Sequence, residues 1–127
     1  MTAGGVPHIL IVDDEAEVLD VLREMVASLG YNVSTASNGA EALAAVLALQ
    51  PDALMTDLAM PAMSGLELIA RVKAARPQLP VIVTAAAIEP ATIEDARARG
   101  AFEYISKPFD LQRLSDVLAS ALRRREQ

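Results

Sequence analysis

Three acidic side chains in this sequence follow short apolar segments, at the points where buried β-strands would end. Asp13 and Asp14 come directly after residues 8–12, and Asp57 comes directly after residues 53–56. Burying a charged group costs free energy unless a partner neutralises it. The positions of these carboxylates therefore raise the question of which other groups lie at the same edge of the fold.

Other polar side chains stand at comparable points later in the chain. Thr84 ends the apolar segment 80–84, and Lys107 follows the segment 101–106, which contains Tyr104. Taken singly, each residue type also has a structural explanation. An acid can cap a helix or form an Asx-turn, a threonine suits a strand, and a lysine before a proline suits a helix boundary. Tyr104 is equally consistent with an ordinary core or edge aromatic.

The segments between these residues predict a regular alternation of strands and helices. Short apolar runs predict β-strands at residues 8–12, 32–36, 53–56, 80–84 and 101–106. Apolar residues at helical spacing predict a helix after each strand, and starts are indicated at Asn38, Ser64, Pro90 and Asp110. Five such β-α units imply an α/β fold, in which helices cover both faces of a mostly parallel sheet.

Composition narrows the functional classes. The chain has 127 residues, a formal net charge of -6 and no cysteine. The length suits one domain, and the acidic balance argues against direct nucleic-acid binding by this domain, because basic groups supply most phosphate contacts. The sequence has neither a signal peptide nor an apolar run long enough to span a membrane. The lack of cysteine is compatible with a reducing compartment, so the predicted location is the cytoplasm.

In an open parallel sheet, ligands bind at the carboxyl ends of the strands. Asp13, Asp14, Asp57, Thr84 and Lys107 would converge there. Three converging carboxylates repel one another, and one lysine is not enough to offset them. Mg²⁺ suits such a site, since it binds carboxylates together with phosphate oxygens. The pattern predicts a metal-dependent phosphoryl site with Asp57 as nucleophile, Lys107 on a phosphoryl oxygen and the Thr84 hydroxyl as a donor.

The ordered set of these residues resembles the receiver domain of two-component response regulators. The resemblance is carried by Asp13-Asp14, the run D-L-A-M-P-A-M-S-G that begins at Asp57, Thr84-Ala85, and the segment Tyr104 to Phe109. It covers the chain strand for strand and implies a five-stranded parallel, flavodoxin-like doubly wound sheet with the order 2-1-3-4-5. Residues 1–127 are then expected to form a single receiver domain, with no effector domain in this chain.

The resemblance implies a role for each of these residues. Asp57 would be the phosphoacceptor, and Lys107 and Thr84 would complete the catalytic set by holding the phosphoryl group. Thr84 and Tyr104 would form the switch, with Tyr104 turning from an outward to an inward position. The bond between Lys107 and Pro108 would be cis, a state that is found almost only before proline.

The same resemblance implies the Mg²⁺ ligands. Asp14, Asp57 and the main-chain carbonyl of Ala59 would bind the ion directly, whereas Asp13 would hold it mainly through water. Ala59 and Ala86 depart from many family members, in which side chains at these positions influence the placement of attacking water. Two alanines offer no hydrogen bond there, so the sequence leaves the direction of their effect on phosphoryl lifetime open.

The expected function is a phosphorylation-activated signalling switch that catalyses only its own phosphorylation and dephosphorylation. A sensor histidine kinase or a histidine phosphotransfer protein would donate the phosphoryl group. The face formed by the fourth helix, fifth strand and fifth helix, with Arg97, Tyr104 and Arg113 and the outward part of residues 88–96, would then bind a protein target or a second copy differently. The alternative is that the chain is the N-terminal receiver of a larger transcriptional regulator.

Three other functions fit the residues less well. A phosphatase with an aspartate nucleophile needs a second acid two residues later, where Ala59 stands. A flavin-binding electron carrier needs a phosphate-binding loop after the first strand, and Asp13-Asp14-Glu15 would repel that phosphate. A receiver that acts only as a binding module would not need the complete set of acids, Thr84 and Lys107.

Overall fold

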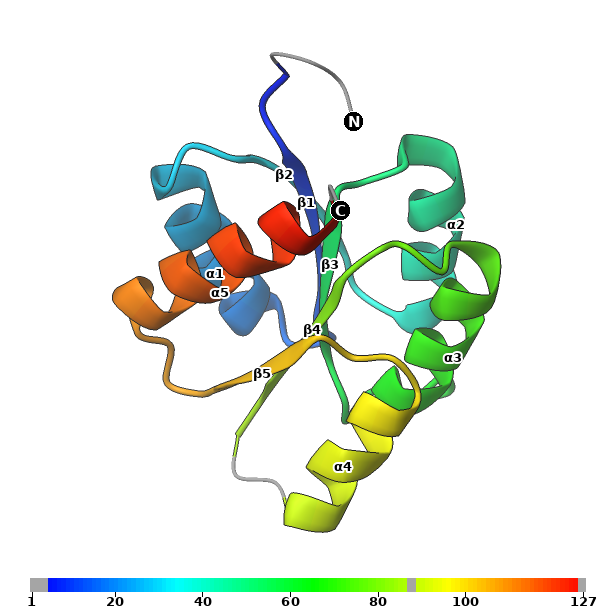
Figure 1. Ribbon diagram of the computed structural model, residues 1–127. Helices are drawn as coiled ribbons and strands as arrows, with labels where there is room; N and C mark the ends of the chain where they lie inside the picture. Colours follow the sequence, from blue (N-terminus) through cyan, green and yellow to red (C-terminus); the bar gives the residue numbers. More distant parts are fainter. Residues whose placement is uncertain (1–4, 87–88, 126–127) are drawn as a thin grey trace.

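The computed structural model describes residues 5–86 and 89–125, which form a three-layer α/β fold (Figure 1). Five parallel strands have the order β2-β1-β3-β4-β5, as predicted. The strands are β1 His8–Val12, β2 Asn32–Ala36, β3 Ala53–Asp57, β4 Val81–Ala85 and β5 Glu103–Ser106. The helices are α1 Ala16–Ser28, α2 Gly39–Leu49, α3 Gly65–Ala75, α4 Pro90–Ala98 and α5 Leu111–Arg125.

Helices cover both faces of the sheet. Figure 1 shows α1 and α5 on one side of the strands, and α2, α3 and α4 on the other. Each face has its own apolar core, because alternate residues of each strand point to opposite sides. Leu54 packs in the core beneath α2, α3 and α4, for example, whereas its neighbour Met55 packs in the core beneath α1 and α5. Both side chains are fully buried.

The predicted helix starts agree with the structure. The Glu41 N–H donates to Asn38 Oδ1 at 2.8 Å, and the Glu67 N–H donates to Ser64 Oγ at 3.2 Å. These bonds satisfy main-chain donors that have no partner within the first helical turn. Pro90 begins α4, where its missing N–H costs nothing.

Several predicted boundaries were wrong by one or two residues. Strand β4 begins at Val81 instead of Pro80, because proline has no N–H to donate to the ladder. Strand β5 begins at Glu103 instead of Ala101, since the Ala101 N–H is used by the end of α4, where it donates to Ala96 O at 2.9 Å. Strand β3 includes Asp57, one residue more than predicted.

The expected binding face, which includes residues 88–96, and the expected domain over residues 1–127 both extend beyond the described residues. Residues 87 and 88, in the loop between β4 and α4, are outside the described residues, as are residues 1–4 and 126–127. Within the described ranges, none of the helices combines the length and the apolar character that a membrane crossing requires.

Candidate functional site

The predicted site residues come together at the carboxyl ends of β1, β3, β4 and β5. Asp13 follows β1, Asp57 ends β3, Thr84 lies in β4 and Lys107 follows β5. The register pairs Asp57 with Thr84 directly across β3 and β4. The strand order accounts for this gathering, because it places β1 and β4 on either side of β3.

Three carboxylates form a compact acidic cluster at this edge. One oxygen from each of Asp13, Asp14 and Asp57 lies within 4.8 Å of the others. Asp13 and Asp57 are buried, whereas Asp14 is exposed and lines a cleft at this edge of the sheet. Three hard oxygen donors at this spacing fit a magnesium ion, which takes one or two carboxylates and keeps several waters.

Lys107 reaches the two buried members of the cluster. Its Nζ lies 3.3 Å from Asp13 Oδ2 and 3.5 Å from Asp57 Oδ2. Burial alone would lower the pKa of Lys107, but the negative charges of Asp57 and Asp13 outweigh this effect and raise it. The lysine therefore stays protonated and can counter negative charge. Its peptide bond to Pro108 is cis, as predicted.

The Asp57 carboxyl group is held by the main chain that follows it. The Leu58 N–H donates to Asp57 Oδ1 at 2.8 Å. Burial raises the pKa of Asp57, and the charge of Asp13 adds to that increase. The charge of Lys107 and main-chain hydrogen bonds from Leu58 and Ala59 oppose it without cancelling it. The positive charge and the hydrogen bonds around Asp57 therefore do not fully offset the cost of burying its ionised carboxylate.

The hydroxyl of Thr84 is the one polar side-chain group buried in the described residues that has no hydrogen-bond partner. Thr84 is fully buried, so water does not replace the missing partner at the surface. Unpaired buried hydroxyls are uncommon and costly, by about 1–3 kcal/mol. Its register partner is Asp57, so a ligand bound to that carboxylate is the natural acceptor.

A cleft of about 290 Å³ opens above these groups. Its lining includes Asp14, Asp57 and Lys107, together with Ala59 and Ala86. Both alanines are exposed, so small apolar side chains border the cleft at these two positions.

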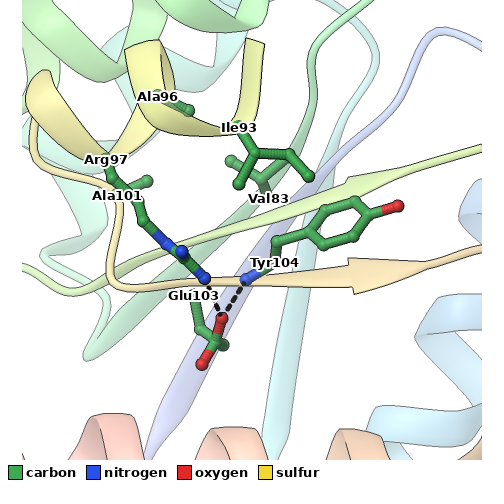
Figure 2. A pocket seen from close by; sticks show the side chains of 7 residues that line it. All are labelled: Val83, Ile93, Ala96, Arg97, Ala101, Glu103 and Tyr104. Atoms are coloured by element: carbon green, nitrogen blue, oxygen red, sulfur yellow. Dashed lines mark hydrogen bonds and ion pairs between the residues drawn. The ribbon is translucent and has the colours of Figure 1, made fainter. Parts of the chain in front are cut away.

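Tyr104 connects the site to the surface between α4 and α5. Its hydroxyl donates to Ala86 O in the loop after β4, at 3.2 Å. Its neighbour Glu103 accepts two hydrogen bonds at Oε1, from the Tyr104 N–H and from the guanidinium of Arg97 in α4 (Figure 2). Both distances are 3.0 Å. Arg113 of α5 donates to Tyr104 O at 3.0 Å. Sequence reasoning named Arg97, Tyr104 and Arg113 but missed Glu103, whose charge alone gave no sign of its partners.

A small cavity lies beneath α4 at the same place. It has a volume of about 10 Å³, enough for about one water molecule. Figure 2 shows Ile93 and Ala96 of α4 above it, with Val83 of β4 and Tyr104 of β5 below. The predicted switch residue Tyr104 therefore lines this small cavity together with residues of α4.

Comparison with known proteins gives consistent matches. The sequence model described as response regulator receiver domain matches residues 9–119. The DNA-binding transcriptional regulator NtrC of Azospirillum brasilense is 42% identical over 114 residues, which are 90% of this chain and 24% of that protein. The crystal structure of a response regulator receiver domain protein from Clostridium thermocellum has a TM-score of 0.91 and 30% identity, and covers 95% of this chain and 98% of that one. NtrX from Brucella abortus has a TM-score of 0.90 and 31% identity, with 96% and 28% coverage. The chain spans about a quarter of the length of the curated relatives it matches.

Proposed function

The chain belongs to the response regulator receiver family, and on that premise we propose how its residues accept a phosphoryl group and respond to it. Receiver domains are phosphorylation-activated signalling switches of two-component systems, and they interact with histidine kinases. The proposal assigns the chemistry to individual side chains. It rests above all on one observation: the buried Thr84 hydroxyl, which has no hydrogen-bond partner within residues 5–86 and 89–125, lies in register with the Asp57 carboxylate.

We assign Asp57 as the phosphoacceptor. A phosphohistidine of a histidine kinase or phosphotransfer protein is the donor. One Asp57 carboxylate oxygen forms the bond to phosphorus while the donor's P–N bond breaks and its electron pair returns to the imidazole. The product is an acyl phosphate on Asp57. Because the transition state is largely loose, positioning and charge neutralisation supply most of the catalysis.

The surrounding residues neutralise the transferred group. Lys107, already 3.5 Å from Asp57 Oδ2, contacts a phosphoryl oxygen as a compact positive charge. The Thr84 hydroxyl, which finds no acceptor among the described residues, donates to another phosphoryl oxygen. Mg²⁺ would be held directly by Asp14, Asp57 and the main-chain carbonyl of Ala59 and through water by Asp13, and would neutralise carboxylate and phosphoryl charge. Self-phosphorylation and self-dephosphorylation are the only catalytic activities in this proposal.

The phosphoryl group is read out through Thr84 and Tyr104. Movement of Thr84 toward the phosphoryl oxygens draws in the loop after β4, to which the Tyr104 hydroxyl is already bonded. Tyr104 and α4 then change position together, because both line the small cavity between α4 and the sheet. The face of α4, β5 and α5 thereby binds a protein target or a second copy with a different affinity in the two states.

The proposal extends to the location of the protein and to its domain arrangement. The chain acts in the cytoplasm as a single receiver domain over residues 1–127, without direct contact to nucleic acid. The alternative, that it is the N-terminal receiver of a longer transcriptional regulator, also fits, because the chain matches about a quarter of the length of a relative described as DNA-binding. Cell fractionation tests the location, and mass measurement of the native protein distinguishes the two arrangements.

Phosphorylation by a small donor tests the central assignment. The protein is incubated with Mg²⁺ and acetyl phosphate, and intact mass is measured. Wild type should gain one phosphoryl group, and chelation of Mg²⁺ should abolish the gain. Asp57→Asn should gain none, whereas Asp20→Asn, a matched change of an exposed acid on α1, should react as wild type does.

A negative mass result needs one further measurement, because rapid hydrolysis would also hide the product. Beryllofluoride imitates the bound phosphoryl group without turning over. Saturable binding of beryllofluoride to wild type but not to Asp57→Asn would retain the assignment. Absence of binding to either protein would reject Asp57 as the acceptor.

A further inference from the structure

Thr56 places a hydroxyl inside the apolar core, directly before Asp57. Its side chain is fully buried and lies on the side of β3 that α2, α3 and α4 cover. The hydroxyl donates to the main-chain carbonyl oxygen of Asp57 at 2.8 Å. A buried hydroxyl needs such a partner, since leaving it unpaired costs free energy. The choice of partner is informative, because it belongs to the proposed phosphoacceptor.

The two ends of one peptide group connect Thr56 to the Asp57 carboxylate. The carbonyl that accepts from Thr56 and the N–H of Leu58 belong to the same planar amide. That N–H donates to Asp57 Oδ1 at 2.8 Å. A continuous chain of hydrogen bonds therefore runs from the Thr56 hydroxyl through the amide to the carboxylate. Hydrogen bonds in such chains polarise and strengthen one another.

The neighbouring contacts limit the movement of this amide further. Gly65 at the start of α3 lies against the same Asp57 carbonyl, because a Cβ at Gly65 would overlap with it. The Gly65 N–H donates to Leu58 O at 2.9 Å, which fixes the next peptide group as well. The amide after Asp57 is thus held on its carbonyl side by Thr56 and Gly65, and on its N–H side by the carboxylate.

We propose that Thr56 is a positioning residue for Asp57, and that it orients the carboxylate through the peptide group between Asp57 and Leu58. The two carboxylate oxygens then have different surroundings. Oδ1 is held by the Leu58 amide, whereas Oδ2 faces Lys107 at 3.5 Å. A valine would have nearly the same shape as threonine and would need no partner in the core. The inference rests on the proposed function of Asp57.

Two substitutions separate the hydroxyl from the volume of the side chain. Thr56→Val removes the hydroxyl and keeps the shape, whereas Thr56→Ser keeps the hydroxyl and removes a methyl group. Val81→Ala is the control for loss of stability alone, because Val81 is fully buried in the same core but far along β4 from the site. Chemical denaturation establishes that each variant is folded under the assay conditions.

The first measurement is the rate of phosphorylation by acetyl phosphate with Mg²⁺. Thr56→Val should react roughly tenfold more slowly than wild type, because reacting groups lose rate when their orientation is relaxed. Thr56→Ser and Val81→Ala should both stay close to the wild-type rate. A wild-type rate for Thr56→Val would overturn the inference, and so would equal slowing in the valine and serine variants.

The second measurement needs no phosphodonor. Hydrogen exchange and the proton chemical shift of the Leu58 amide are recorded by NMR. Thr56→Val should exchange faster at Leu58 and shift upfield, and Thr56→Ser should match wild type. An unchanged Leu58 amide in Thr56→Val would contradict the inference. Failure of wild type to accept a phosphoryl group or to bind beryllofluoride would reject the proposed function instead, and the amide comparison would still decide the role of Thr56.

Discussion

Gly65 is not one of the proposed site residues, but its substitution by alanine should displace the main chain that follows Asp57. A Cβ at Gly65 would lie 2.6 Å from Leu58 Cα and closer still to the Asp57 carbonyl oxygen, whereas ordinary contacts begin at 3.4 Å. The backbone after Asp57 must therefore open by at least roughly 0.8 Å, the difference between 3.4 Å and the 2.6 Å contact with Leu58 Cα. Overpacking of this kind costs about 1–3 kcal/mol. Misplacement by about 1 Å can also slow a reaction by up to roughly a hundredfold.

Gly39→Ala provides the matched control for this substitution. Gly39 begins α2 after the cap Asn38, just as Gly65 begins α3 after the cap Ser64. A Cβ at Gly39 would lie 2.8 Å from Met63 Cβ and 2.9 Å from Met63 Sδ, so this control overlaps with a side chain and leaves the main chain at Asp57 and Leu58 free of overlap. Any gain from replacing a helical glycine, about 0.4–1 kcal/mol, applies equally to both positions.

Urea denaturation and phosphorylation by acetyl phosphate measure the two effects. Gly65→Ala should be less stable than Gly39→Ala by about 1–3 kcal/mol, the expected cost of overpacking. It should also react at least roughly tenfold more slowly when fully folded. Equal stability and equal rates in the two variants would refute the inference that α3 presses against the Asp57 backbone.

Three further outcomes test the electrostatics of the site. Because burial raises the pKa of Asp57, the stability linked to its protonated form is fully present below about pH 3.8 and is lost as pH rises through the folded-state pKa. Without Mg²⁺, Asp57→Asn should therefore unfold at higher urea than wild type at pH 7, with the difference shrinking toward pH 3.8; equal midpoints at pH 7 would contradict this. Lys107→Met should lose roughly 1–3 kcal/mol at pH 7 by leaving two buried carboxylates without their cation, and an equal loss at low pH would argue against that cause. Mg²⁺ at about 100 times its dissociation constant should stabilise wild type by about 2.7 kcal/mol in thermal or urea unfolding, and a similar gain in Asp57→Asn would exclude Asp57 as a major ligand.

Many of the site residues could be predicted from local sequence, because an apolar run that ends in a polar residue indicates the end of a buried strand. The apolar run before Asp57 and the one before Asp13 predicted two carboxylates at the same edge, and their main-chain positions agree with that prediction. The helix caps at Asn38 and Ser64 were also predictable from local sequence, since the side chain that accepts the capping hydrogen bond lies three positions before the donor N–H. Exact boundaries were less accurate, because Pro80 and the end of α4 alter which main-chain groups are free to pair.

Chain order and residue type determined the class of fold, the identity of the acidic residues and the kind of ion that suits them. Only the tertiary structure decided which groups share an environment. It leaves the Thr84 hydroxyl without a partner among the described residues, brings Lys107 to Asp13 across 94 positions of sequence, and joins Glu103 to Arg97. It also links Thr56 to the Asp57 carboxylate through a single amide. These relations depend on distances and directions of a few ångströms, which packing sets and residue spacing along the chain does not encode.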